Sequence, residues 1–326
     1  MRFIVYGAGA VGGVVGGRMF QHGHDVVLVA RGANLDRLRD VGLRLESSDG
    51  SVTLPIPAIG HPSALEFAAD DVALLCVKSQ DTGHALDALA AIAPAELPIV
   101  CVQNGVANEP AALRRFPNVY GVCVVCPALH LEPGVVEASA SPVPGILDVG
   151  RYPHGVDPLG DALAGAFAES TFVAVARPDI MRWKHGKLLN NLSNAIDALC
   201  GSGDGVQELR SRARREGIAC LEAAGIEYVS ADEDAARRGA SFEWGGAASR
   251  SRSGSSSWQS LARGTGSIEA DYLNGEVVLL GRVHGVPTPV NALLQTLAAR
   301  AARERWTPRS MDPESVIRLL PGTRDF

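Results

Sequence analysis

The sequence predicts an α/β protein, with a parallel-sheet domain over residues 1–177 and an all-helical domain over residues 178–326. In the first half, short β-branched runs alternate with helical stretches, the pattern of a parallel sheet covered by helices. After Pro178, apolar residues recur at helical spacing. The length of 326 residues also exceeds the ~250 residues at which a single hydrophobic core stops growing.

The strands of the first domain are predicted from apolar runs. We expect strands at Phe3–Tyr6, Val26–Ala30, Val72–Val77, Pro98–Val102 and, as the last strand, Phe172–Ala176, with a helix through about Gly23 after the first of them. Leu43 to Pro55 alternates around Ser48-Asp49-Gly50 and predicts a hairpin. Between residues 119 and 150 the runs become short and turn-linked, which predicts antiparallel pieces at the end of the sheet.

The second domain is expected to contain helices over residues 180–200, 205–224, 268–284 and 289–304. Gly285 and Pro287 form a stop signal after the third of these. Thr288 and Pro289 then open the next helix as a cap and a first-turn proline. The stretch from Gly245 to Ser257 is rich in Gly, Ser and Ala and predicts a flexible loop.

Composition excludes several classes of protein. A net charge of −6 gives no basic footprint for nucleic acid, and no apolar run approaches the ~18 residues of a membrane-spanning helix. The first residues are too soon interrupted by glycine to form a secretory signal. Cys123 and Cys126 have metal spacing but lie in an apolar run without a second such pair, so we predict buried thiols, no metal and a cytoplasmic location.

Lysine is scarce in this chain, which contains 30 basic residues but only the lysines Lys78, Lys184 and Lys187. A lysine ammonium is a compact charge that can release a proton, whereas an arginine guanidinium effectively cannot. A lysine in this chain therefore marks a place where arginine will not serve, unless it is simply a surface residue.

A glycine motif directly follows the first predicted strand and opens a helix. In this context, a GxGxxG motif indicates a Rossmann-type dinucleotide site, with the pyrophosphate at the helix N-terminus. The second strand ends at Arg31 without the acid that NAD enzymes place there. Because a guanidinium suits a 2′-phosphate, the sequence favours NADP (NADPH) over NAD. The predicted cofactor residues of the motif are Gly7, Ala8, Gly9, Ala10, Val11 and Gly12.

Polar residues follow two predicted strands and line one predicted helix. Lys78 and Asn104 come directly after strands whose carboxyl ends face the ligand edge of such a sheet. Lys187, Asn191 and Asn194 are spaced i, i+4 and i+7 on one helical face. Asparagine is a poor helix former, so this stripe indicates a wet cleft rather than an ordinary solvated helix face.

A further segment contains Ser267 and Glu269. Ser267 is expected to cap a helix and to place Glu269 in its first turn. Taken from the residues alone, Glu269 is a first-turn acid rather than a catalytic one.

These clusters, in this order and spacing, resemble the ketopantoate reductases (2-dehydropantoate 2-reductases). The resemblance runs over nearly the whole chain. It is carried by the glycine motif, Lys78, Gln103-Asn104-Gly105, Lys187 with Asn191, the Ser-Ser-x-x-Gln stretch at 255–259, and Glu269-x-Asp271-Tyr-Leu-Asn-Gly275. Members of this family use NADPH to reduce ketopantoate to pantoate, and they bind the substrate between a Rossmann domain and a helical domain.

The resemblance implies a role for each matching residue. Lys187 would be the general acid that protonates the ketone oxygen, and Glu269 would hold or tune it and also contribute to the cofactor site. Asn191 and a serine, Ser256 or Ser257, would bind the substrate. The residues expected at the junction of cofactor and substrate are Lys78 and Asn104, and Arg31 is expected at the 2′-phosphate.

Two features depart from the family pattern. The second asparagine expected eight residues after the lysine is absent, because position 195 is Ala195 and the nearest asparagine is Asn194. The serine is ambiguous: Gln259 as reference selects Ser256, whereas counting back from Glu269 selects Ser257. Two alternatives therefore stay open, a reductase of another branched 2-oxoacid and a non-catalytic NADP(H)-binding sensor. The expected partner is a small 2-oxoacid, and a homodimer is left open.

Overall fold

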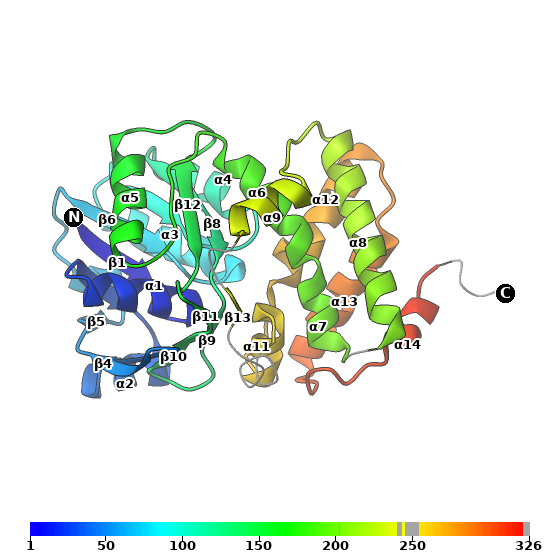
Figure 1. The fold of residues 1–326 in the computed structure, drawn as a ribbon, viewed down its shortest axis with the longest axis horizontal. Coiled ribbons are helices and arrows are strands. Elements are labelled where there is room, and N and C mark those ends of the chain that lie inside the picture. The colour runs from blue at the N-terminus through cyan, green and yellow to red at the C-terminus, as the bar shows by residue number, and fades with distance from the viewer. Residues whose placement is uncertain (202, 240–242, 245–253, 322–326) are drawn as a thin grey trace. The chain divides into compact units, whose positions relative to one another are not determined.

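The computed structural model describes residues 1–201, 203–239, 243–244 and 254–321 (Figure 1). The chain forms two compact units. Unit 1 comprises Met1–Lys184 and Ala231–Ser251, and unit 2 comprises His185–Ser230 and Arg252–Phe326. The units divide inside a helix, seven residues after the predicted domain boundary at 177, and unit 1 takes back a later segment of the chain. The division of the chain into domains at 177/178 stays a prediction.

The larger sheet of unit 1 has the strand order β12-β8-β7-β6-β1-β2-β5 among the described residues (Figure 1). Adjacent strands are parallel except β12, which is antiparallel to β8. The order of the connections reverses between β1 and β6, which is where the ligand crevice of an open α/β sheet lies. The bounds are β1 (Arg2–Tyr6), β2 (Asp25–Val29), β5 (Ala58–Ile59), β6 (Asp71–Leu75), β7 (Ile99–Cys101), β8 (Val119–Val125) and β12 (Ile146–Arg151).

Both faces of this sheet are covered, as a parallel sheet requires. In β6, Val72 and Leu74 belong to one hydrophobic core, whereas Ala73 and Leu75 belong to the other. Residues of α1 and α5 join the first core, and residues of α3 and α4 join the second. The helices of unit 1 are α1 (Ala10–Gln21), α2 (Gly32–Asp40), α3 (Thr82–Ala90), α4 (Asn108–Leu113), α5 (Pro158–Glu169) and α9 (Ala231–Arg238), with short 3-10 turns η1 (Pro62–Ala64) and η2 (Ser79–Asp81).

The predicted hairpin at 43–55 is confirmed: β3 (Leu43–Ser47) pairs antiparallel with β4 (Gly50–Leu54). It belongs to a second sheet with the order β4-β3-β10-β9. There β10 (Val135–Ala138) is parallel to β3 and antiparallel to β9 (Ala128–Leu129). A further pair joins β11 (Ala140–Ser141) to β13 (Glu243–Trp244), which brings the later segment of the chain back to unit 1.

The predicted last strand at Phe172–Ala176 is wrong, because this segment forms only isolated bridges to β12. Leu147 and Val149 of β12 donate backbone N–H groups to its carbonyls. The N–H of Val175, however, donates to the Asp148 carboxylate at 3.2 Å. A side chain thus replaces one bond of the ladder and interrupts it.

Unit 2 is helical, as predicted, although two expected helices are broken. The expected helix at 180–200 divides at Leu192, whose carbonyl accepts a hydrogen bond from the Asn274 side chain at 3.1 Å. The expected helix at 268–284 divides at Leu273, whose backbone is not helical (φ −113°, ψ −83°). The elements are α6 (Ile180–Asn191, begun in unit 1), α7 (Ser193–Leu199), α8 (Asp204–Ala223), α11 (Ser256–Ala262), η3 (Glu269–Tyr272), α12 (Asn274–His284), α13 (Pro289–Arg303) and α14 (Pro313–Arg318).

The ends of these helices test the predicted caps. Gly285 ends α12 in the left-handed conformation (φ 72°), and Pro289 begins α13, both as predicted. The cap predicted at Ser267 is wrong, since Ile268 precedes η3 without a side-chain cap. The loop predicted up to Ser257 ends earlier, because Ser255 caps α11 by accepting a hydrogen bond from Trp258 N. Residues 245–253 of that loop lie outside the described residues.

None of the described helices combines the length and the apolar character that crossing a membrane requires.

Candidate active site

The glycine motif follows β1 at the point where the sheet order reverses. Gly7 has φ +110°, and a Cβ there would lie 2.7 Å from Val77 N. A Cβ at Gly12 would lie 2.2 Å from Gly7 O, so only glycine lets α1 pack this closely on the strand. Around Gly9 no atom lies within 4 Å of the Cβ position. The open side of the loop is therefore at Gly9, beside the first turn of α1.

This arrangement fits a dinucleotide phosphate. The first helical bond of α1 runs from Gly13 N to Gly9 O at 2.7 Å, so the N–H groups of Ala10, Val11 and Gly12 precede it. Such N–H groups and the positive end of the helix dipole attract an anion. Ala8 is buried and donates its N–H to Val29 O at 3.3 Å, which ties the loop to the end of β2.

Asn34 supports the loop from α2, a contact that the sequence analysis missed. Its Nδ2 donates to Ala8 O at 2.9 Å, and its Oδ1 accepts from Gly134 N at 2.8 Å. One side chain thus joins the glycine motif to the turn between β9 and β10. No motif marks Asn34, because its partners lie far away in the sequence.

Arg31 lies between β2 and α2 with its side chain 79% exposed. The guanidinium contacts the Asp81 carboxylate at 3.1 Å. Burial raises the pKa of the neighbouring Tyr6, and the charge of Arg31 works in the opposite direction. An exposed guanidinium at the end of β2 can bind a phosphate group. That phosphate would compete with the Asp81 carboxylate for the guanidinium.

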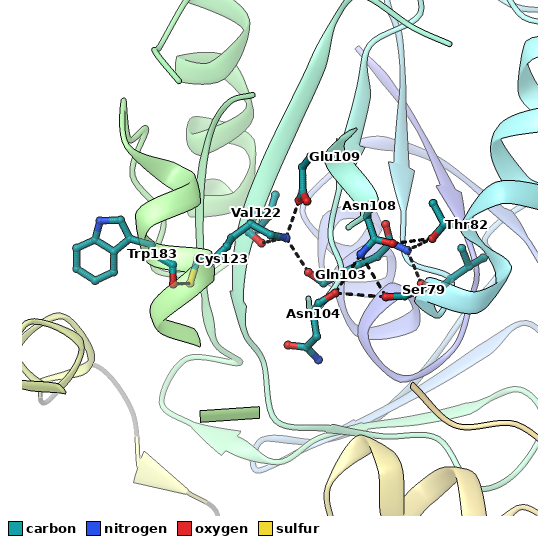
Figure 2. Close-up of polar contacts among 11 residues, drawn as sticks. Ser79, Thr82, Gln103, Asn104, Asn108, Glu109, Val122, Cys123 and Trp183 are labelled. Atoms are coloured by element: carbon teal, nitrogen blue, oxygen red, sulfur yellow. Dashed lines mark hydrogen bonds and ion pairs between the residues drawn. The ribbon is translucent and has the colours of Figure 1, made fainter. Parts of the chain in front are cut away.

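A buried polar network joins the loops after β6 and β7 (Figure 2). Gln103 Nε2 donates to Val77 O at 2.7 Å and to Thr82 Oγ1 at 2.8 Å. Thr82 donates to Asn108 Oδ1 at 2.8 Å, and Asn108 Nδ2 donates to Ser79 Oγ at 3.2 Å. These side chains are nearly fully buried, so the network holds both strand ends rigidly. Sequence analysis placed only Gln103 of this network in a motif.

The two predicted strand-end residues lie at the edge of this network. The carbonyl of Asn104 accepts a hydrogen bond from Asn108 Nδ2 at 3.0 Å. Its side-chain amide points away from the network (Figure 2), so it is available for a ligand. Lys78 precedes η2 and is half-buried.

Lys184 and Glu109 form a buried ion pair next to the loop after β7. Lys184 Nζ lies 2.7 Å from Glu109 Oε1, with 2% and 0% of the two side chains exposed. The ammonium also donates to Gln103 O at 2.8 Å and to Val122 O at 3.2 Å. The pKa of nearby Cys101 is raised by burial and by Glu109, which Lys184 partly opposes. Sequence analysis noticed Lys184 only through the scarcity of lysine.

In unit 2, the predicted polar stripe on α6 and α7 forms two hydrogen-bonded pairs. Lys187 Nζ donates to Asn191 Oδ1 at 2.8 Å, one helical turn later. Asn194 Nδ2 lies 3.4 Å from Ser256 Oγ at the start of α11. Asn191 is buried, whereas Lys187 and Asn194 are half-buried.

The two candidate serines differ in their surroundings. Ser256 is half-buried and contacts Asn194 of the polar stripe. Ser257 is 1% exposed, and its hydroxyl lacks a hydrogen-bond partner among the described residues. Glu269 lies in η3 and is 5% exposed. Of the two serines, Ser256 is the one that the structure brings to the polar stripe.

Comparison with known protein families gives a consistent match over most of the chain. The profile described as ketopantoate reductase PanE/ApbA matches residues 3–154, and the profile of its C-terminal region matches residues 179–302. The 2-dehydropantoate 2-reductase of Halobacterium salinarum is 29% identical over 318 residues, covering 93% of this chain and 100% of that protein.

Solved structures agree with this match. The PanE/ApbA family ketopantoate reductase of Ralstonia eutropha is 28% identical with a TM-score of 0.78, covering 94% of this chain and 99% of that one. D-mandelate dehydrogenase, solved with NADH and anilino(oxo)acetate, is 21% identical with a TM-score of 0.80 over 94% of this chain and 99% of that one. The latter likeness shows the fold alone, and it confirms the predicted α/β and helical architecture.

Exchanging the glycines of the motif for alanine should separate binding from folding. We expect Gly9→Ala to change the free energy of unfolding by no more than about 1 kcal/mol, since it costs only a helix N-cap preference. It should raise the Kd for a nicotinamide dinucleotide such as NADPH by at least ~10-fold, because a Cβ on the open side of the loop would obstruct the hydrogen bonds to a charged phosphate. We expect Gly12→Ala to cost at least about 2 kcal/mol through overpacking. Denaturant unfolding and NADPH fluorescence titration measure both effects.

Gly165→Ala is the matched control, because the Cβ position at this exposed site in α5 also meets no atom within 4 Å. It should leave the Kd for NADPH unchanged. A Gly9→Ala protein that binds NADPH as tightly as the unaltered chain would contradict the phosphate site.

Proposed function

Since the chain belongs to the ketopantoate reductase family, we propose that it reduces the keto group of 2-dehydropantoate to the hydroxyl of pantoate. The observation that carries the proposal is the hydrogen bond between Lys187 and Asn191 on the predicted polar stripe. A bound NADPH supplies the hydride for the carbonyl carbon, and the protein must supply orientation and a proton for the carbonyl oxygen.

Lys187 is the proposed source of that proton. An ammonium group has three N–H donors, and one of them is directed at Asn191 Oδ1 at 2.8 Å. This bond restricts the rotation of the long lysine side chain, which helps to hold Nζ in place. After the proton leaves, the neutral amine recovers one from solvent. General acid catalysis of this kind contributes ~10²–10⁴-fold to the rate.

The remaining polar residues are proposed to bind the substrate. The amide of Asn194 and the hydroxyl of Ser256 lie side by side and can donate to a carboxylate or hydroxyl. We include Asn191 in this group and assign Glu269, a buried acid, to holding Lys187. Asn104 and Lys78 are assigned to the cofactor side, since they follow strands of the Rossmann-type sheet. Ser257 is not assigned a ligand.

NADPH is proposed rather than NADH because of Arg31. Position 31, at the end of β2, is an exposed arginine rather than the acid that NAD enzymes place there, and its guanidinium contacts the Asp81 carboxylate. A 2′-phosphate forms charge-assisted hydrogen bonds with such a group, whereas an acid there would repel it. The phosphates of the cofactor are assigned to the Gly7–Gly12 loop.

The proposed reaction is tested by the loss of NADPH absorbance with 2-dehydropantoate and with a panel of other branched and unbranched 2-oxoacids. We expect the highest kcat/KM with 2-dehydropantoate. If only a different oxoacid is reduced, the proposed substrate is wrong, but the proposed role of Lys187 as proton donor stands. Bound NADPH without turnover of any member of the panel would overturn the proposal in favour of a sensor.

Substitution of Lys187 tests the proton donor. We expect Lys187→Ala and Lys187→Arg to lower kcat by ~10²–10⁴-fold, the latter because a guanidinium does not release a proton. Stopped-flow turnover and NADPH titration provide the two measurements, and the Kd for NADPH should change less than about twofold. An arginine variant with normal kcat would show that charge alone is needed.

Substitution of Arg31 tests the cofactor preference. We expect Arg31→Ala to raise KM for NADPH by ~10–100-fold, the worth of charge-assisted hydrogen bonds, while kinetics with NADH stay constant. Arg39→Ala is the control, because Arg39 is an exposed arginine within α2, and it should change neither constant. Equal losses with both cofactors would contradict the assignment of Arg31 to the 2′-phosphate.

A further inference from the structure

Lys184 is a fully buried ammonium whose hydrogen-bonding capacity is matched by its surroundings. Glu109 Oε1, Gln103 O and Val122 O lie 2.7, 2.8 and 3.2 Å from Nζ, one oxygen for each of its three N–H donors. The three oxygens come from α4, the loop after β7, and β8. A single side chain of α6 therefore binds three different parts of unit 1.

Stability alone is a weak reason for such a pair. Taking two charges out of water costs about as much as their attraction returns, and apolar residues of similar volume often serve as well. Glu109 has 0% of its side chain exposed, and apart from the ion pair with Lys184 its carboxylate makes no hydrogen bond among the described residues. The carboxylate thus depends on Lys184 for compensation. We therefore take the pair to specify an arrangement of the chain rather than to add stability.

The space around the pair is built for lysine. A Cβ at Gly121 of β8 would lie 3.3 Å from Lys184 Cδ and 3.2 Å from Glu109 Oε1. Glycine at this position leaves room for the narrow lysine stem and the carboxylate. The branched, planar guanidinium of arginine is wider than an ammonium and cannot direct its donors at three converging oxygens. This explains one of the three lysines in a chain that otherwise uses arginine.

The position of Lys184 on its helix connects it to the proposed reaction. Helix α6 runs from Ile180 to Asn191, and Lys187 comes three residues after Lys184, about 4.5 Å further along the axis. Lys184 binds the carbonyl of Gln103, which belongs to the rigid peptide group leading into Asn104. Lys184 thus joins α6, the helix that continues to Lys187, to the backbone next to Asn104 by a hydrogen bond.

We propose that Lys184 is a positioning residue, which through Glu109 and the Gln103 carbonyl fixes the helix that presents Lys187. The inference rests on the proposed function, in which Lys187 protonates the substrate. Lys184 itself, with its three donors directed at protein oxygens, touches neither substrate nor cofactor. Its contribution is the placement of another residue, where an error of about 1 Å can cost ~10²-fold in rate.

The test removes the pair without leaving a buried charge. Lys184→Met alone leaves the buried Glu109 carboxylate without a compensating charge, so this variant is expected to fold poorly. The informative protein is therefore the double variant Lys184→Met with Glu109→Met. We expect it to fold, to bind NADPH within about twofold of the unaltered Kd, and to lose ~10–100-fold in kcat. With NADPH deuterated at the transferred position, the isotope effect on kcat should rise, because a misplaced acid slows the chemical step.

A second ion pair in unit 1, with a buried carboxylate and a partly exposed guanidinium, provides the control. Arg2 and Asp71 contact each other at 2.7 Å, with the carboxylate 0% exposed, at the amino ends of β1 and β6. These ends lie opposite the ligand edge of the sheet. Arg2→Met with Asp71→Met should lose stability but keep kcat and the isotope effect. Equal loss of kcat in both double variants would reduce the proposal to a stability effect and overturn it.

Hydrogen exchange separates this inference from the proposed reaction. Amides of α6 should exchange at least ~10-fold faster in the Lys184/Glu109 double variant than in the control. Failure of the unaltered protein to reduce any 2-oxoacid would overturn the proposed function, and the exchange of α6 would still decide whether Lys184 holds the helix. A double variant with unaltered kcat or unaltered α6 exchange overturns the positioning role.

Discussion

Parallel strands place all their carboxyl ends at one edge of the sheet, and the backbone groups at this edge need partners once the strands stop. In unit 1 the loops after β6 and β7 meet this need with buried side chains. Gln103 reaches the carbonyl of Val77, and Asn108 reaches the carbonyl of Asn104. The polar network is therefore a consequence of the fold, and it makes the ligand edge rigid before any ligand is bound.

Neighbouring residues at this edge have different roles, since some hold the loop in place and others are available for a ligand. Gln103 and Asn108 are buried, and their side-chain amides are hydrogen-bonded to protein groups, so they hold the loop. Asn104 lies between them in the sequence, and its amide points away from the network (Figure 2). The glycine loop shows the same division. Other atoms of the chain occupy the space that a Cβ would take at Gly7 and Gly12, whereas the space beside Gly9 is open. Packing thus determines which residue of each motif remains accessible to a ligand.

Sequence alone predicted what depends on local pattern. Apolar runs located most strands of the larger sheet, and the glycine motif and Gly285 follow from backbone geometry. The failures involve side chains that act over long distances in the sequence. Asp148 takes the N–H of Val175 and interrupts an expected strand, and Asn274 takes the carbonyl of Leu192 where an expected helix divides. Lys184 shows the same limit, since no spacing links it to Glu109, 75 positions earlier in the chain.

Lys184 and Lys187 lie on one helix, and their partners suit them to opposite tasks. Glu109 compensates the buried charge of Lys184, and the three N–H donors of this ammonium are all directed at protein oxygens, so Lys184 is held in one arrangement. Asn191 offers Lys187 a neutral amide oxygen at 2.8 Å, which orients the amine. A chain that could use arginine for a fixed charge uses lysine twice here, once for the narrow space beside Gly121 and once, in the proposed reaction, for a proton that can move.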